Sequence, residues 1–330
     1  METFGSGGAL GESVVPSLLE LHRSGELTQR VDEAVALLSE CRLCGRDCGV
    51  NRLSNQRGEC GIGRLARVSS AFAHRGEEAV LSGNYGSGTV FLSGCSLHCV
   101  FCQNYDVSHD NQGHPCHSAD LADLFEMLVS KGCHNVNLVT PTHVMPQLLE
   151  GFLSWMKVSD SSSGAPIVWN TSGYDSLQTL RLLDGVVDIY MPDVKMFDRV
   201  GSERYFRASE YPDVVRSGLK EMFAQVGPAR FDSNGLMLKG VLVRHLVMPQ
   251  LEEDSRDVID FLAREFSDDI VVNVMGQYMP AGAAYDYPAL RHRPRLEVVA
   301  DLKSYARGKG LRLEEQCKVK VENGLMQRLF

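Results

Sequence analysis

The sequence predicts an α/β fold, a partial (β/α)6 barrel of the TIM type with a small N-terminal helical and cysteine-knuckle extension. Between residues 89 and 307, short apolar runs alternate with helical patterns, as is typical of βαβ units with a parallel sheet. Six such units can be counted, which is too few for a closed eight-stranded barrel. Two cysteine clusters flank the first strand of the series, so we expect metal binding there.

Composition narrows the class of protein. The 330 residues suffice for one large domain with a small appendage. The net charge of −9 argues against a nucleic-acid partner. No apolar run reaches the length of a membrane span, and residues 1–18 lack the features of a signal peptide. We therefore expect a cytoplasmic protein with neither a membrane nor a nucleic-acid partner.

The N-terminal segment has apolar residues at helical spacing, such as Val31, Ala34 and Leu38, with a break near Ser24-Gly25. The chain divides into four expected parts: the helical segment 1–40, a metal-binding knuckle with linker 41–75, a core domain 76–310 and a tail 311–330.

The knuckle carries four cysteines with the spacing C-x2-C-x3-C-x11-C. In a chain without a secretory signal, such a cluster indicates metal ligands rather than disulfides. Zinc and a second iron–sulfur cluster both fit four thiolates, and the closed site would be structural or an electron relay. Its predicted ligands are Cys41, Cys44, Cys48 and Cys60. The scattered cysteines are expected to be buried or incidental thiols: Cys116, Cys133 and Cys317.

The elements of the core follow from periodicity. The stretch 65–90 is interpreted as a linker, with Glu77 and Glu78 in a solvated turn, and Ser118 as the cap of the first core helix. Strands are expected at 89–94, 135–139, 166–170, 186–195, 241–248 and 270–275. Helices are expected after Ser118 and at 144–158, 177–183, 214–225, 258–266 and 296–307.

The strongest motif is C-x3-C-x2-C at Cys95, Cys99 and Cys102, which follows a strand and Gly94 and has Phe101 before its last cysteine. Three thiolates leave one iron of a cubane without a protein ligand, and an open position is the mark of a catalytic metal site. The motif resembles that of the radical S-adenosylmethionine (SAM) superfamily. The resemblance implies a [4Fe–4S] cluster on these cysteines with SAM on the open iron.

Polar residues follow the other strands, and the carboxyl ends of parallel strands gather the chemistry of a barrel. Lys195 and Arg244 are candidates to bind the SAM carboxylate. Phe101 is a candidate to flank the adenine. The candidates for the ribose and amino groups are Thr140, Thr142, Thr171 and Asn170.

Several further segments resemble activating enzymes of the pyruvate formate-lyase type, and more specifically the PflX-type branch of activases. They include Cys102-Gln103-Asn104, Asn137 to His143, Asn170 to Asp175, Val187 to Asp193, Val243 to Pro249 and Met275 to Tyr278. The resemblance implies that Asp193 and Lys195 lie near the SAM carboxylate and Arg244 beside SAM. It also implies that Met191, Asn170 and Thr171 surround a monovalent-cation site. Three departures are the replacement of a Gly-Gly-Glu run by Thr140 to His143, Asn170 in place of Asp, and Gln250 in place of Gly.

The resemblance thus implies an oxidoreductase that cleaves SAM reductively to a 5′-deoxyadenosyl radical. No catalytic residue is assigned beyond the cluster ligands. By resemblance, the radical activates a glycyl-radical enzyme, and a flavodoxin or ferredoxin supplies the electron. The alternatives are another peptide or small-molecule substrate, a non-catalytic iron–sulfur electron carrier, and a zinc-stabilised interaction protein.

Overall fold

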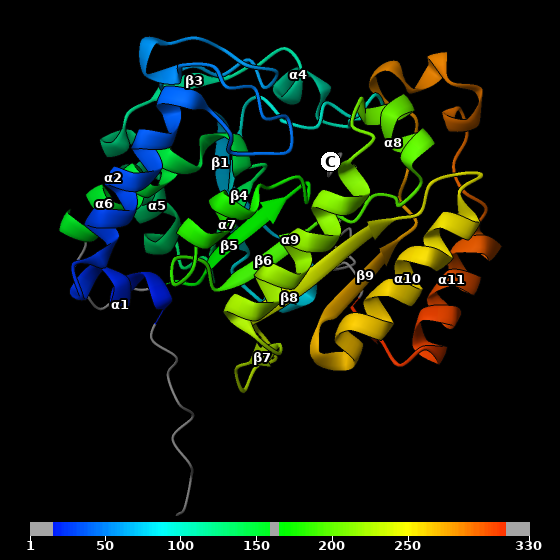
Figure 1. Ribbon diagram of the computed structural model, residues 1–330. Helices are drawn as coiled ribbons and strands as arrows, with labels where there is room; N and C mark the ends of the chain where they lie inside the picture. The colour runs from blue at the N-terminus through cyan, green and yellow to red at the C-terminus, as the bar shows by residue number, and fades with distance from the viewer. Residues whose placement is uncertain (1–15, 159–164, 315–330) are drawn as a thin grey trace, which may run out of the picture.

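The computed structural model describes residues 16–158 and 165–314 (Figure 1). Cys317, the first fifteen residues of the predicted N-terminal segment and most of the predicted tail lie outside the described residues. The N-terminal segment contains two helices, α1 (Ser17–Arg23) and α2 (Glu26–Ala36), and the predicted break between them is at Gly25, whose φ is 80°.

All six predicted strands are present and form one open parallel series. Consecutive pairs in this series are hydrogen-bonded in parallel from β2 to β10. The sheet does not close on itself within the described residues, so the open α/β fold with a partial barrel is confirmed. The six strands are β2 (Ser87–Leu92), β4 (Val136–Val139), β5 (Ile167–Thr171), β6 (Ile189–Pro192), β8 (Met237–Leu246) and β9 (Val271–Met275). A seventh strand that was not predicted, β10 (Arg312–Leu313), pairs with β9.

The predicted helices are also present, and they cover the outer face of the sheet (Figure 1). They are α5 (Ser118–Ser130), α6 (Met145–Val158), α7 (Leu177–Leu182), α9 (Tyr211–Val226), α10 (Glu252–Phe266) and α11 (Leu296–Gly308). The predicted cap of α5 is wrong, because the N-cap is His117, whose backbone N–H donates to Asp120 Oδ2 at 2.7 Å.

The interpretation of residues 65–90 as a linker is wrong. Residues Ala66–His74 form β1, which pairs antiparallel with β2 and with β3 (His114–Cys116). A short helix, α3 (Ala79–Ser82), follows β1. Further short elements are α4 (Tyr105–Ser108), α8 (Arg199–Phe206), β7 (Arg230–Phe231) and the 3-10 turns Leu37–Glu40, Arg52–Ser54, Thr142–Val144, Ser267–Asp269, Gly282–Asp286 and Pro288–Leu290.

The barrel interior is filled on the side of α3. Val80 and Leu81 of that helix pack in one apolar cluster with inward side chains of β5, β6 and β8, namely Val168, Ile189, Met191 and Leu242. This apolar cluster leaves the space at the carboxyl ends of the strands open for a ligand.

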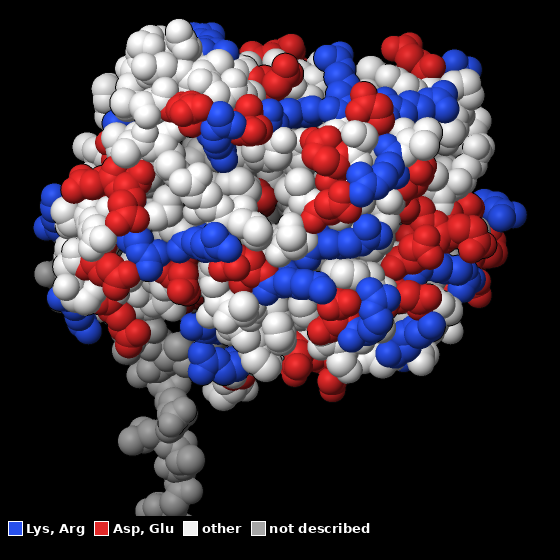
Figure 2. Space-filling view, in the orientation of Figure 1, with Lys and Arg blue, Asp and Glu red and all other residues white. Residues whose placement is uncertain are grey.

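The molecular surface matches the mixed composition. Figure 2 shows acidic and basic side chains interspersed over one face, without an extended basic patch on it. None of the helices in residues 16–158 and 165–314 is both long and apolar enough to cross a membrane.

Candidate active site

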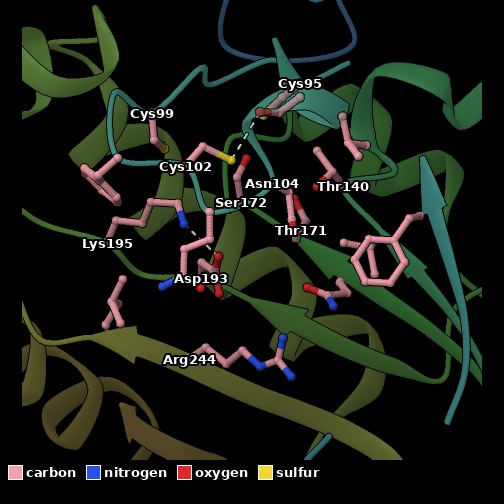
Figure 3. Close-up of a pocket in the computed structure, with 18 of the residues that line it drawn as sticks. Cys95, Cys99, Cys102, Asn104, Thr140, Thr171, Ser172, Asp193, Lys195 and Arg244 are labelled. Carbon is pink, nitrogen blue, oxygen red and sulfur yellow. Dashed lines mark hydrogen bonds and ion pairs between the residues drawn. The ribbon is translucent and has the colours of Figure 1, made fainter. Parts of the chain in front are cut away.

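One cavity of about 260 Å³ lies at the carboxyl ends of the strands (Figure 3). Its walls come from the loop 95–102, called here the three-cysteine loop, and from the ends of β2, β4, β5, β6, β8 and β9. The predicted site residues that line it are Cys95, Cys99, Phe101, Cys102, Thr140, Asn170, Thr171, Asp193, Lys195 and Arg244.

The three-cysteine loop presents all of its sulfur atoms to this cavity. Leu97 N–H donates to Cys95 Sγ at 3.3 Å, and Ser108 Oγ donates to Cys102 Sγ at 3.2 Å. Burial raises the pKa of the Cys95 and Cys99 thiols, so their thiolates need a bound cation to form. Three converging cysteines with such second-sphere donors fit one face of an iron–sulfur cluster.

An ion pair at the end of β6 also lines the cavity. Lys195 Nζ is 2.7 Å from Asp193 Oδ2 (Figure 3). Burial alone would lower the pKa of Lys195, but the charge of Asp193 raises it, so the ammonium stays charged. The buried Tyr211 hydroxyl accepts a hydrogen bond from the backbone N–H of Lys195 at 3.1 Å and donates one to the backbone carbonyl of Asp193 at 2.8 Å. These two bonds fix the backbone of the ion pair.

The strand-end hydroxyls separate into two groups. Thr140 lines the cavity with φ of 59°, a left-handed conformation that is strained for a β-branched residue. Thr142 is fully buried and does not line the cavity, because its hydroxyl donates to Asp175 Oδ1 at 2.8 Å. Thr171 lines the cavity but donates to Asp175 Oδ2 at 2.6 Å. Asp175 therefore orders these strand ends.

The far end of the cavity holds a buried ionic network that sequence reasoning missed. Arg244 Nε donates to Glu78 Oε1 at 2.9 Å, and its Nη2 donates to Glu78 Oε2 at 2.6 Å and to Glu77 Oε2. His74 Nδ1 is 3.1 Å from Glu77 Oε1. The predicted solvated turn is thus wrong, since Glu78 is 0% exposed and Glu77 6%.

We call Arg244, Glu77 and Glu78 the floor network. The guanidinium that the resemblance placed beside SAM is engaged by two carboxylates at the level of α3. The apolar run Ala79-Val80-Leu81 directly after the two glutamates was the sequence signal that this segment enters the core.

Phe101 lies in the cavity wall between two other rings. Its centroid is 5.8 Å from that of Phe206 and 5.9 Å from that of Tyr278, both edge-to-face. The ring therefore has a fixed orientation, and a contact with a bound base remains a prediction.

The four remaining predicted metal ligands line a second, small cavity of about 10 Å³. We call Cys41, Cys44, Cys48 and Cys60 the four-cysteine site. Among residues 16–158 and 165–314, no group of three or more His, Cys, Asp or Glu is arranged to hold a metal ion. The ligands of a cubane stand farther apart than those of one ion, because each thiolate binds a different iron.

Comparison with known proteins adds a family and a domain. Residues 82–191 match the model of a 4Fe-4S single cluster domain. This matched region includes the whole three-cysteine loop. The uncharacterized protein MJ0674 of Methanocaldococcus jannaschii is 32% identical over 300 residues, which are 87% of this chain and 78% of that protein.

Two solved structures are similar to this chain at low sequence identity. A radical SAM methyltransferase from Sphaerobacter thermophilus has a TM-score of 0.47 and 13% identity, over 71% of this chain and 67% of that one. Streptococcus suis SuiB bound to S-adenosylmethionine has a TM-score of 0.44 and 12% identity, over 68% of this chain and 48% of that one. The present chain thus spans about half of SuiB.

Proposed function

This chain belongs to the same family as the MJ0674 protein, and we propose that it is a radical SAM enzyme. One observation carries the proposal. Three cysteines from one short loop, inside the region that matches a 4Fe-4S single cluster domain, all line one cavity. This loop can hold three irons of a cubane and leave the fourth facing the cavity.

The residues of the cavity suit the head group of SAM. An ammonium has three N–H donors, and Lys195 gives one of them to Asp193. Lys195 can therefore also meet a carboxylate, while the free oxygen of Asp193 can meet an amino group. The Asp193–Lys195 pair thus complements an amino-acid zwitterion.

The other wall residues are proposed to hold the nucleoside part. Thr140, Asn170 and Thr171 line the cavity, and the fixed ring of Phe101 offers an apolar edge. The cluster and SAM, when bound, supply a 5′-deoxyadenosyl radical that abstracts a hydrogen atom from the substrate. The protein itself orients SAM and keeps water from the radical.

In its narrower form, the proposal is that the substrate is a glycine of a partner protein, so that the chain is an activating enzyme of the pyruvate formate-lyase type, which takes its electron from a flavodoxin or ferredoxin. The ordered set of segments that resemble the PflX-type activases supports this form. A stable glycyl radical detected by electron paramagnetic resonance (EPR) in a co-incubated glycyl-radical enzyme would test it.

The broader proposal is tested by anaerobic reconstitution with iron and sulfide, followed by dithionite and SAM. We expect 5′-deoxyadenosine from the wild-type protein and none from Cys99→Ala. Cys116→Ala, a cysteine outside both sites, is the matched control and should retain activity. Iron-loaded wild-type protein that forms no 5′-deoxyadenosine would refute the proposal.

A further inference from the structure

The four-cysteine site and the three-cysteine loop touch each other. Arg46 stands between two ligands of the four-cysteine site, and its Nε donates to the Ser96 carbonyl at 2.8 Å and its Nη2 to the Leu97 carbonyl at 3.0 Å. A Cβ on Gly94, the residue before Cys95, would lie 2.6 Å from the Cys60 carbonyl. A ligand of one site is therefore in backbone contact with the residue that precedes a ligand of the other.

A second connection runs through His143, which lines the four-cysteine cavity and is fully buried. Its Nε2 lies 2.8 Å from the carbonyl oxygen of Ser93, two residues before Cys95. Its own carbonyl accepts from Arg52 Nη1, which in turn lies 3.7 Å from Cys41 Sγ. A continuous set of hydrogen bonds thus joins the sulfur of one site to the lead-in of the other.

Arg52 identifies the four-cysteine site as a place for an anionic centre. It is 0% exposed, lines the cavity, and makes no ion pair with a described carboxylate. Its Nη2 is buried without a hydrogen-bond partner. A buried guanidinium is costly unless a counter-charge is close, and a metal centre with four thiolates supplies that charge and sulfur acceptors.

We propose that the four-cysteine site holds a second iron–sulfur cluster that passes single electrons to the cluster of the three-cysteine loop. This inference rests on the proposed function for the role of the electron. Zinc has no redox chemistry, whereas N–H donors such as Arg52 tune the potential of a cluster. In each transfer, a low-potential protein donor loses one electron, the second cluster gains and then releases it, the first cluster gains it, and no bond or proton changes.

The identity of the metal is tested in the variant Cys95→Ala/Cys99→Ala/Cys102→Ala, which removes the first cluster. After anaerobic reconstitution, we expect about four irons per chain and an EPR signal with dithionite that SAM does not alter. Zinc without iron, or no metal, would overturn the proposal. If this variant does not fold, the same analysis is made on the wild-type protein. About eight irons per chain and two EPR signals, one of them insensitive to SAM, are expected. About four irons with one signal would refute the proposal of a second cluster.

The relay is tested by the source of the electron. We expect the ratio of flavodoxin-driven to dithionite-driven 5′-deoxyadenosine formation to fall at least tenfold in Cys60→Ala, with Cys116→Ala as the unaffected control. Arg52→Gln should lower the potential of the SAM-insensitive signal more than Arg52→Lys, which keeps the charge. An unchanged ratio in Cys60→Ala would refute the relay. If the proposed function fails, no donor gives 5′-deoxyadenosine, and the iron analysis still decides the identity of the metal.

Discussion

Replacing Arg244 by methionine tests whether the floor network is ionised and holds the barrel together. Arg244 is the cation of this network, and the substitution would leave Glu77 and Glu78 buried without it. Removing one partner of a buried ion pair costs roughly 3–5 kcal/mol. We therefore expect Arg244→Met to lower the free energy of unfolding by about this amount at neutral pH.

The pKa of Glu77 gives an independent magnitude. Burial alone would raise this pKa, but Arg244 and His74 lower it from 4.5 to about 2. At about 1.4 kcal/mol per pKa unit, this shift corresponds to about 3 kcal/mol. Because the folded-state pKa is depressed, this stabilisation is complete above about pH 4.5 and is lost as the pH falls toward 2.

The variant should show the opposite dependence on pH. Without Arg244, burial raises the pKa of the Glu77 carboxyl, so the folded variant keeps a proton that the unfolded chain releases. Its free energy of unfolding should then decrease between about pH 5 and about pH 8, a range in which Glu77 makes no such difference in the wild type.

Urea unfolding followed by circular dichroism at the two ends of that range measures both effects. Arg199→Met is the matched control, since Arg199 pairs with Asp213 and both side chains are 57% exposed. It should cost less than about 1 kcal/mol. A loss below about 1 kcal/mol in Arg244→Met, or a loss that does not grow with pH, would refute this account of the network.

Three further changes test separate features. Gln250 has a left-handed backbone conformation, with φ of 64°. The substitution Gln250→Gly should relieve this strain, and we expect it to raise the free energy of unfolding in urea by up to about 1 kcal/mol. Asp175 accepts hydrogen bonds from three buried side-chain donors, so Asp175→Asn, which replaces an acceptor oxygen by a donor, should cost roughly 1–3 kcal/mol in the same assay. Ser108→Ala removes the O–H donor to Cys102 Sγ and should lower the reduction potential of the first cluster in a redox titration followed by EPR; an unchanged potential would contradict this.

Most of the core fold could be predicted because the strand and the helix of each βα unit each show their own hydrophobic periodicity in the local sequence. Every predicted strand between residues 89 and 275 has a counterpart in the sheet. The strand Ala66–His74 was missed because it pairs antiparallel outside the βα series. Most of its residues are small and several are partly exposed, so no strong apolar alternation marks it.

The site also has one part that a short stretch of sequence reveals and one part that only the tertiary structure brings together. The cysteine motif is local, and all three of its cysteines line the cavity. The floor network could not be predicted from spacing, because Glu78 and Arg244 are 166 residues apart in the chain. A pair of glutamates in a short segment looks solvated until the fold brings an arginine to them.

The charges around the cavity bear on which ligand it can hold. The cavity and its floor contain three carboxylates, from Glu77, Glu78 and Asp193, and two cations, from Lys195 and Arg244, when His74 is left out of the count. Because two of the carboxylates engage Arg244, Lys195 is the cation within reach of a bound anion. A surplus of one negative charge in a buried site favours a ligand of net positive charge. SAM, with an ammonium, a sulfonium and one carboxylate, has that charge. Its analogue S-adenosylhomocysteine lacks the sulfonium and has no net charge. We therefore infer that Glu77→Gln weakens the binding of SAM more than that of S-adenosylhomocysteine, as measured by calorimetry on the iron-loaded protein. Equal losses for the two ligands would show that the floor network acts through structure alone.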